Sequence, residues 1–114
     1  MKADLIDLHI HSNYSDGTQD IEEIIDISAS IPLKVISITD HDTIDGIKPA
    51  RNHIIKKQYP LDLITGTELS SKYGNLDVHI LGYCFNEEDE QFTKILKFYK
   101  EKREERAYKI IDKL

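Results

Sequence analysis

One short stretch near the amino terminus, Asp4-Leu5-Ile6-Asp7-Leu8-His9-Ile10-His11, decides the expected fold. Its polar and apolar residues alternate, which is the period of a β-strand whose two faces meet different surroundings. The side chains of Asp7, His9 and His11 then point the same way. The pattern therefore predicts a strand that carries two histidines on one of its faces.

The residues that follow this strand predict a turn, a helix and a second strand. Segment 12–18 is rich in turn formers, and Asp20 can cap a helix over 21–30 in which Glu23 completes a capping box. Segment 33–39 is a run of mostly β-branched residues, typical of a strand buried in a sheet. The Asp40-His41-Asp42 sequence thus falls at the carboxyl end of a strand.

The second half continues the alternation of helices and strands. We expect a helix from Lys48-Pro49 to Gln58, a strand over 61–70, a turn at 73–75 and a strand over 76–83 that pairs with its predecessor as a hairpin. After an acidic start at 87–90, the rest predicts one long helix. This order is typical of an α/β fold with parallel pairing, in which functional loops gather at the carboxyl ends of strands.

Composition limits the classes of protein to which the chain can belong. Its 114 residues are 39% hydrophobic and 32% charged, which fits a single soluble globular unit. The net charge of −6 argues against non-specific nucleic-acid binding. No apolar stretch approaches the roughly 20 residues of a membrane span, so we expect a cytoplasmic protein with no membrane contact. The lone Cys84 is interpreted as a small buried hydrophobe.

Two histidines and an aspartate near the amino terminus are candidate metal ligands. His9 and His11 are two residues apart on a strand, so both imidazoles can reach one ion from one face. Half-buried histidines that hydrogen-bond to backbone would give the same pattern. Asp16 precedes Gly17 and by itself fits an ordinary turn residue.

Three further candidates lie on later segments. His41 has a carboxylate on each side, and these carboxylates could orient its ring or cap the next helix. Glu68 interrupts an otherwise apolar strand, where an unpaired carboxylate is costly to bury, so it needs a cation or an exposed face. His79 sits where its apolar neighbours face the other side of the strand, and an ordinary strand histidine would also fit. His53 is assigned to a solvated helix face.

Taken together, these six residues favour one shared metal centre over a separate structural role for each of them. Four of the five histidines and two carboxylates fall at strand ends that an α/β topology brings to one rim. A mixed imidazole and carboxylate shell suits zinc, manganese or iron better than calcium or magnesium. The set also exceeds the four ligands of a tetrahedral ion, which implies more than one metal.

Five motifs together resemble one known family, the PHP (polymerase and histidinol phosphatase) family of metal-dependent phosphoesterases. The motifs are Asp7-Leu8-His9-Ile10-His11-Ser12, Ser15-Asp16-Gly17, Ile38-Thr39-Asp40-His41-Asp42-Thr43, Gly66-Thr67-Glu68-Leu69-Ser70 and His79-Ile80-Leu81-Gly82-Tyr83. Within the family, they are most similar to stand-alone nucleoside 3′,5′-bisphosphate phosphatases and short-RNA 5′-3′ exonucleases. The resemblance implies a distorted β/α barrel, of which this chain would form the amino-terminal part.

The resemblance also implies a role for each candidate residue. It assigns two or three divalent transition-metal ions (Mn, Zn or Fe) to six ligands: His9, His11, Asp16, His41, Glu68 and His79. Glu68 would bridge two ions, and Asp7 and Asp40 would support the ligands. It implies hydrolysis of phosphomonoesters or terminal phosphodiesters of small nucleotides or short oligonucleotides. Residues 1–86 would be the amino-terminal part of the PHP domain, and residues 87–114 the start of a helical insertion.

Two other interpretations stay open. The family pattern continues with a further His and a late Asp-x-His pair that this sequence does not contain, so we expect an incomplete ligand set. The chain would then be a metal-binding or oligomerising module that uses its terminal helix or an exposed sheet edge. The PHP module of a bacterial replicative polymerase is the third interpretation, and it is disfavoured because no polymerase sequence is present.

Overall fold

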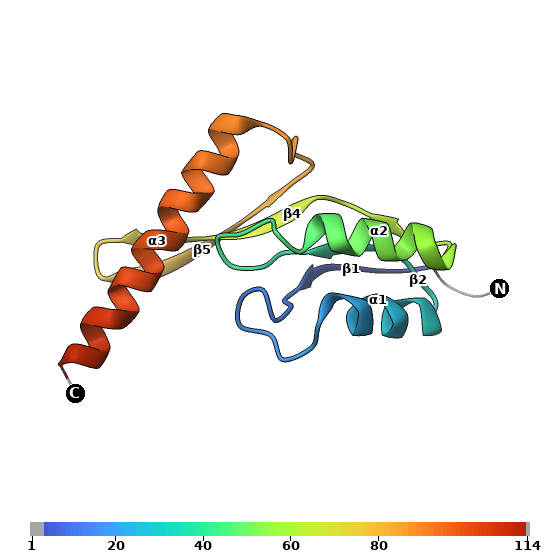
Figure 1. The fold of residues 1–114 in the computed structure, drawn as a ribbon, viewed down its shortest axis with the longest axis horizontal. Coiled ribbons are helices and arrows are strands. Elements are labelled where there is room, and N and C mark those ends of the chain that lie inside the picture. Colours follow the sequence, from blue (N-terminus) through green and yellow to red (C-terminus); the bar gives the residue numbers. More distant parts are fainter. Residues whose placement is uncertain (1–3, 114) are drawn as a thin grey trace.

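The computed structural model describes residues 4–113 as two open sheets with three helices (Figure 1). The first sheet holds three strands and the second holds two. The elements are, in chain order, β1 (Leu5–Ile10), α1 (Ile21–Ser30), β2 (Leu33–Ile38), α2 (Ile47–Lys57), β3 (Asp62–Leu63), β4 (Gly66–Tyr73), β5 (Leu76–Tyr83) and α3 (Glu90–Asp112). The α/β class is therefore as predicted, whereas the sheets of the described residues do not close into a barrel.

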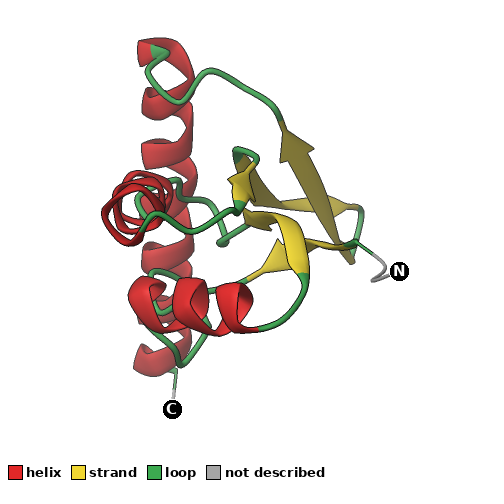
Figure 2. Cartoon of the chain, turned by 90° about the vertical axis from the view of Figure 1, so that its right-hand side faces the viewer, coloured by secondary structure: helices red, strands yellow, loops and turns green. Residues whose placement is uncertain are grey.

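The first sheet places β2 between β1 and β3, and both pairings are parallel. α1 and α2 connect its strands and lie on the same side of the sheet (Figure 2). α1 begins as the sequence predicts, because the Asp20 carboxylate accepts a hydrogen bond from the Glu23 amide at 2.8 Å. Parallel pairing sends the carboxyl ends of β1 and β2 to one edge of the sheet.

The core lies between this sheet and the two helices that cover it. It is built almost entirely from isoleucine and other aliphatic side chains of α1, β2 and α2, including Ile24, Ile25, Ile36, Ile38 and Ala50. Burial of such side chains supplies most of the free energy that holds the layers together. The core ends where β2 gives way to polar residues, and Thr39, Asp40 and His41 are nevertheless buried.

The hairpin of β4 and β5 attaches to the end of β2. The Glu68 amide donates to the Asp40 carbonyl at 3.1 Å, and the Asp42 amide donates to the Glu68 carbonyl at 3.0 Å. The single strand predicted over 61–70 is in fact two strands, because the backbone changes its hydrogen-bonding partner there. The Ile64 amide still donates to β2, whereas the Thr65 carbonyl accepts from Cys84 at the end of the hairpin.

Two predictions about individual side chains were wrong. His53 was placed on a solvated helix face, but it is 6% exposed and points from α2 toward α1, where its Nε2 lies 2.8 Å from the Asp26 carboxylate. The helix turns His53 to the same side as the buried Ala50 and Ile54. Cys84 was interpreted as buried, but it is exposed in a bend just after β5.

We expect the His53 contact to make stability depend on pH. The hydrogen bond with His53, followed by that with Tyr59, lowers the pKa of Asp26 below its usual 3.8. A carboxylate whose pKa is lowered by folding stabilises the fold above its unfolded pKa and loses that effect as the pH falls through its folded pKa. Asp26→Asn should therefore lower the urea midpoint at about pH 6 but much less at about pH 3.

The control for this prediction is Tyr59→Phe, which removes one of the two donors to Asp26 and should have a smaller effect. An equal loss of stability from Asp26→Asn at both pH values would show that the charge of Asp26 contributes nothing.

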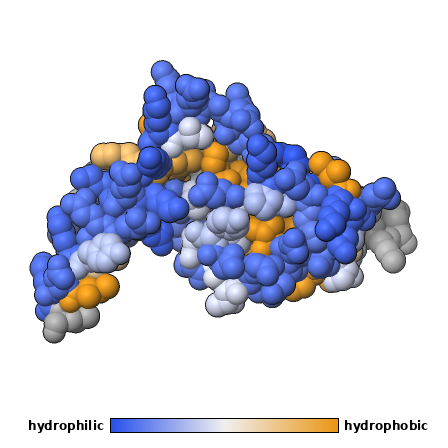
Figure 3. Space-filling view, in the orientation of Figure 1, coloured by the Kyte–Doolittle hydropathy of each residue, from blue (hydrophilic) through white to orange (hydrophobic). Residues whose placement is uncertain are grey.

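α3 leaves the hairpin and crosses the end of the sheets (Figure 1). The Asp89 carboxylate caps it by accepting from the Phe92 amide at 2.9 Å. Among its described residues only Leu96 is buried. Within residues 4–113, no helix combines the length and apolar composition needed to cross a bilayer. The face seen in Figure 3 is mostly hydrophilic, with small separate hydrophobic groups, one of them near the carboxyl end of α3.

Candidate metal centre

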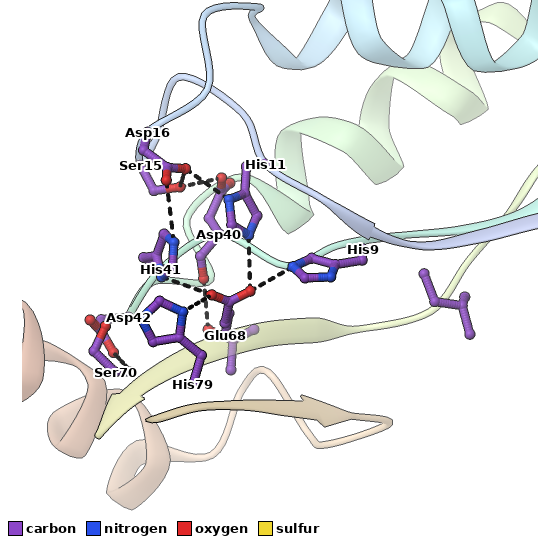
Figure 4. Close-up of polar contacts among 12 residues, drawn as sticks. His9, His11, Ser15, Asp16, Asp40, His41, Asp42, Glu68, Ser70 and His79 are labelled. Carbon is purple, nitrogen blue, oxygen red and sulfur yellow. Dashed lines mark hydrogen bonds and ion pairs between the residues drawn. The ribbon is translucent and has the colours of Figure 1, made fainter. Parts of the chain in front are cut away.

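The six predicted ligands come together at the edge where β1, β2 and the hairpin meet (Figure 4). β1 and the residue after it supply His9 and His11, and the following loop supplies Asp16. The remaining three come from the segment after β2, from β4 and from β5, and are His41, Glu68 and His79. The topology thus gathers residues that are up to 70 positions apart (His9 to His79).

Glu68 lies at the centre of this cluster. Its Oε1 atom is 2.6 Å from His9 Nε2 and 3.3 Å from His11 Nε2. Its Oε2 atom is 2.9 Å from His79 Nδ1 and 3.2 Å from His41 Nδ1. The Glu68 side chain is only 4% exposed, so its two oxygens face these four imidazoles rather than solvent. A carboxylate in this position can contribute one oxygen to each of two neighbouring cations.

Asp16 extends the cluster on the side away from His79. Its Oδ1 lies 2.8 Å from His11 Nδ1, and its Oδ2 lies 3.3 Å from His41 Nε2. The four imidazoles form a row with centroid separations of 5.1, 4.5 and 5.0 Å. Three overlapping groups result, and within each group the ligand atoms lie within 4.8 Å of one another: His9, His11 and Glu68; His11, Asp16 and His41; His41, Glu68 and His79.

The donor set fits divalent transition-metal ions. Imidazole nitrogens and carboxylate oxygens are the ligands that zinc, manganese and iron use in proteins. His41 Nδ1 is buried and makes no hydrogen bond, although a buried polar atom normally has a partner. A bound cation would use the lone pair of this nitrogen.

The electrostatics of the cluster favour the protonation states that bind metal. Burial raises the pKa of Glu68, but the His9 hydrogen bond and the neighbouring imidazoles together outweigh it, so the net pKa is lowered. Burial also raises the pKa of Asp16, but the hydrogen bond and the charge interaction with His11 outweigh this effect. The net pKa of Asp16 is therefore lowered as well. Burial lowers the pKa of His41, and Glu68 opposes this only in part. Ionised carboxylates and a neutral imidazole are the forms that offer lone pairs to a cation.

Asp40 supports the centre through the loop that carries Asp16. The buried Asp40 carboxylate accepts from the Ser12 amide and hydroxyl, both at 2.6 Å, and from the Ser15 hydroxyl at 2.7 Å. Gly17 lets this loop fold closely, because a Cβ atom there would lie 2.5 Å from the His11 carbonyl oxygen. Asp40 therefore holds the loop in place and makes no hydrogen bond to the His41 ring.

Asp7 has a weaker connection to the cluster than predicted. It is exposed, and its carboxylate accepts from the backbone amide of His9 at 3.1 Å rather than from an imidazole. Sequence reasoning did not find Tyr83, whose hydroxyl donates to the Leu8 carbonyl at 2.6 Å and so ties β5 to β1 beside the centre. The only signal for Tyr83 was its place at the end of the last motif.

A basic cavity of about 510 Å³ opens beside His79, between the hairpin and α3. Its lining includes Lys72 of β4 and Lys102, Arg103 and Arg106 of α3, and these four cations outnumber the two lining carboxylates, Asp42 and Asp77. Clustered cations of this kind attract anions, and arginine matches the geometry of phosphate oxygens. No pattern in the sequence indicates how far α3 lies from the metal ligands, so the cavity could not be predicted.

The fold and the cluster together define an α/β protein with a candidate multinuclear metal centre at one edge of its sheets. The sequence pattern of the PHP domain family matches residues 7–112. The chain belongs to this family. It is 38% identical, over 95% of its length, to a 5′-3′ exoribonuclease of Haemophilus influenzae. It is 34% identical, over 90% of its length, to a 3′,5′-nucleoside bisphosphate phosphatase of Chromobacterium violaceum.

A solved structure supports the same relationship. The chain superimposes on an amidohydrolase from Chromobacterium violaceum with a TM-score of 0.82 and 33% identity, over 91% of its own length; that structure contains bound sulfate and no metal. The chain spans 39% of the exoribonuclease, 35% of the phosphatase and 36% of the amidohydrolase. The names of the first two relatives describe enzymes that act on RNA and on nucleoside bisphosphates.

Proposed function

We propose that this chain carries most of the centre of a metal-dependent phosphoesterase that hydrolyses phosphomonoesters or terminal phosphodiesters of small nucleotides or short oligonucleotides. The observation that carries the proposal is the convergence of four imidazoles and two carboxylates in three overlapping groups. The names of the two relatives support the substrate class. The six residues are proposed as ligands of two or three ions of manganese, zinc or iron.

The basic cavity supports a substrate with phosphate at two positions. It adjoins His79, so a nucleotide could place one phosphate among the metal ligands and another near Lys72, Arg103 and Arg106. Each arginine offers paired N–H donors that match two phosphoryl oxygens. The net charge of the chain is −6, so these cations concentrate the attraction for an anion at the site rather than spreading it over the surface.

The residues of the chain have different roles in the proposed hydrolysis. Bound divalent ions supply Lewis acidity, which activates water and neutralises phosphoryl charge. Glu68 and the four histidines hold the ions, and Asp16 closes the cluster on the far side. Asp40 fixes the loop that bears Asp16 through its hydrogen bonds to Ser12 and Ser15. The α3 cations orient the substrate and balance the charge of a second phosphate.

The finer architecture is part of the proposal. The parallel β1–β2–β3 sheet, with both helices on one side, is compatible with the first strands of a distorted β/α barrel. Residues 1–86 would form that amino-terminal part, and residues 87–114 would begin a helical insertion that covers the centre.

The test is hydrolysis of adenosine 3′,5′-bisphosphate by the manganese-loaded chain, measured as phosphate release. We expect release by the wild-type chain and none by His41→Ala, because His41 contributes to two of the three ligand groups. Lys34→Ala on the exposed surface of β2 is the control and should behave like wild type. Equal release by His41→Ala and wild type would refute the proposal.

A second candidate function rests on the exposed apolar side chains of β1 at the edge of the first sheet. If the chain binds metal but releases no phosphate, it is a metal-binding or oligomerising module. The exposed Leu5 and Ile6 of β1 would then offer an apolar strand for pairing with another copy. Sedimentation of the metal-loaded chain distinguishes a monomer from such an assembly.

A further inference from the structure

Asp42 is a buried carboxylate that contacts two parts of the molecule, the hairpin and α3, and it is not among the six candidate metal ligands. It follows His41, is 1% exposed and has a backbone φ of 55°, a left-handed conformation that few residues other than glycine, asparagine and aspartate adopt. Its Oδ1 atom accepts from the Ser70 amide of β4 at 2.9 Å. One oxygen of the Asp42 carboxylate is therefore bound to the hairpin at Ser70, which lies two residues after Glu68.

The other oxygen of Asp42 points toward α3. Oδ2 is fully buried and makes no hydrogen bond, and Arg103 Nη1 lies 3.5 Å from it. The Arg103 side chain is 44% exposed and, like Asp42, lines the basic cavity. A buried carboxylate left without a paired cation is strongly destabilised, which favours keeping the Arg103 guanidinium beside Asp42. The remaining N–H groups of Arg103 are left for a ligand in the cavity.

The neighbouring ion pairs of α3 differ from this one in burial. Lys100 lies 3.7 Å from Asp45, and Arg106 lies 4.0 Å from Asp77. Both of these carboxylates are more than half exposed, and exposed pairs contribute little to stability. Lys100, Arg103 and Arg106 recur every three residues and so share one face of the helix. Only the central member of this row meets a buried partner.

We propose that Asp42 is a positioning residue, which fixes the Arg103 guanidinium in the wall of the basic cavity so that it can bind a phosphoryl group of the substrate. The inference rests on the proposed phosphoesterase function. Asp42 acts through Arg103. An arginine that is held in advance loses less side-chain entropy when the anion binds, which strengthens the binding.

The first experiment measures the docking of α3 without metal or ligand, by hydrogen exchange of the amides in residues 96–106. Asp42→Asn keeps the acceptor for Ser70 and tolerates the left-handed backbone, so it removes mainly the charge. We expect exchange to become several-fold faster in Asp42→Asn and in Arg103→Gln, but not in the control Asp45→Asn. Unchanged exchange in Asp42→Asn would overturn the proposal.

The second experiment measures binding of inorganic phosphate to the manganese-loaded chain by calorimetry. We expect Asp42→Asn and Arg103→Gln each to weaken binding by about tenfold, the loss of one charge-assisted hydrogen bond. The double variant should be no weaker than Arg103→Gln alone, because Asp42 acts through Arg103. Tighter binding by Asp42→Asn would show that its carboxylate merely repels anions, and additive losses would show a separate role; either result overturns the proposal.

Metal content separates this inference from the proposed function. Asp42→Asn should bind as much manganese as wild type, so a loss of metal would assign Asp42 to the metal centre instead. If the wild-type chain binds no manganese, the proposed function fails, while hydrogen exchange still tests the contact between Asp42 and Arg103. If the wild-type chain binds manganese but no phosphate, the proposed role of Arg103 is wrong.

Discussion

Replacing Glu68 with glutamine is expected to remove most of the bound transition metal from the chain. The two carboxylate oxygens of Glu68 face the imidazoles of His9, His11, His41 and His79. A glutamine at this position would offer the metal a single neutral carbonyl oxygen in their place. Loss of even an outer partner of a metal ligand typically lowers affinity by about 10- to 100-fold, so loss of the shared carboxylate should cost more. Metal content after dialysis, measured by mass spectrometry, checks this result.

The matched control is Glu88→Gln, because this exposed glutamate lies in the loop before α3. It should retain the metal content of wild type. Circular dichroism should show that the Glu68 variant keeps its helices, since the cluster lies outside the aliphatic core. Equal metal content in wild type and Glu68→Gln would remove Glu68 from the proposed centre.

Gly66→Ala should destabilise the fold by about 1–3 kcal/mol, the usual cost of forcing an extra methyl group into a packed interior. A Cβ atom on Gly66 would overlap the buried Ser37 hydroxyl and would lie 2.8 Å from Thr39 Cγ2. β4 would have to move away from β2, and Glu68 would move with it. Urea denaturation followed by circular dichroism measures the change in the free energy of unfolding.

Two further variants make this prediction specific. Gly82→Ala changes a glycine on β5 whose added Cβ atom would meet nothing within 4 Å, so its stability should match wild type. Ser37→Ala removes a hydroxyl that has no hydrogen-bond partner, and in combination with Gly66→Ala it should restore part of the lost stability. A double variant less stable than Gly66→Ala would rule out the clash with Ser37 as the cause.

The helices and strands could be predicted because their signals are local. Alternation in β1, the Asp20 cap of α1 and the turn between β4 and β5 depend on neighbouring residues, and the structure has these features where expected. The break between β3 and β4 was missed, because it depends on a change of backbone partner at Ile64 and Thr65. Such a change follows from how distant strands meet and leaves no pattern in the sequence.

The candidate site was predicted as a set of residues but not as an arrangement. Motif order assigned six ligands. The parallel pairing of β1 and β2 explains why the ligands at their ends meet, and the antiparallel hairpin brings Glu68 and His79 to them. That the six residues bind metal stays a prediction. Asp42 was considered only as a partner of the His41 ring or as a helix cap, because its contact with Arg103 spans 61 positions and depends on where α3 crosses the hairpin. His53 was missed because the face of α2 that meets α1 is set by packing.

The attachment of α3 by charged side chains, with Leu96 as its buried residue, has a consequence for how the chain is handled in solution. Mobile ions screen exposed charges, and the screening length falls from about 10 Å in 0.1 M electrolyte to about 3 Å in 1 M. Concentrated buffers will therefore weaken the outer pairs at Asp45 and Asp77 before the buried one at Asp42. In dilute electrolyte all three ion pairs of α3 should stay formed, and α3 should stay in place as one wall of the basic cavity.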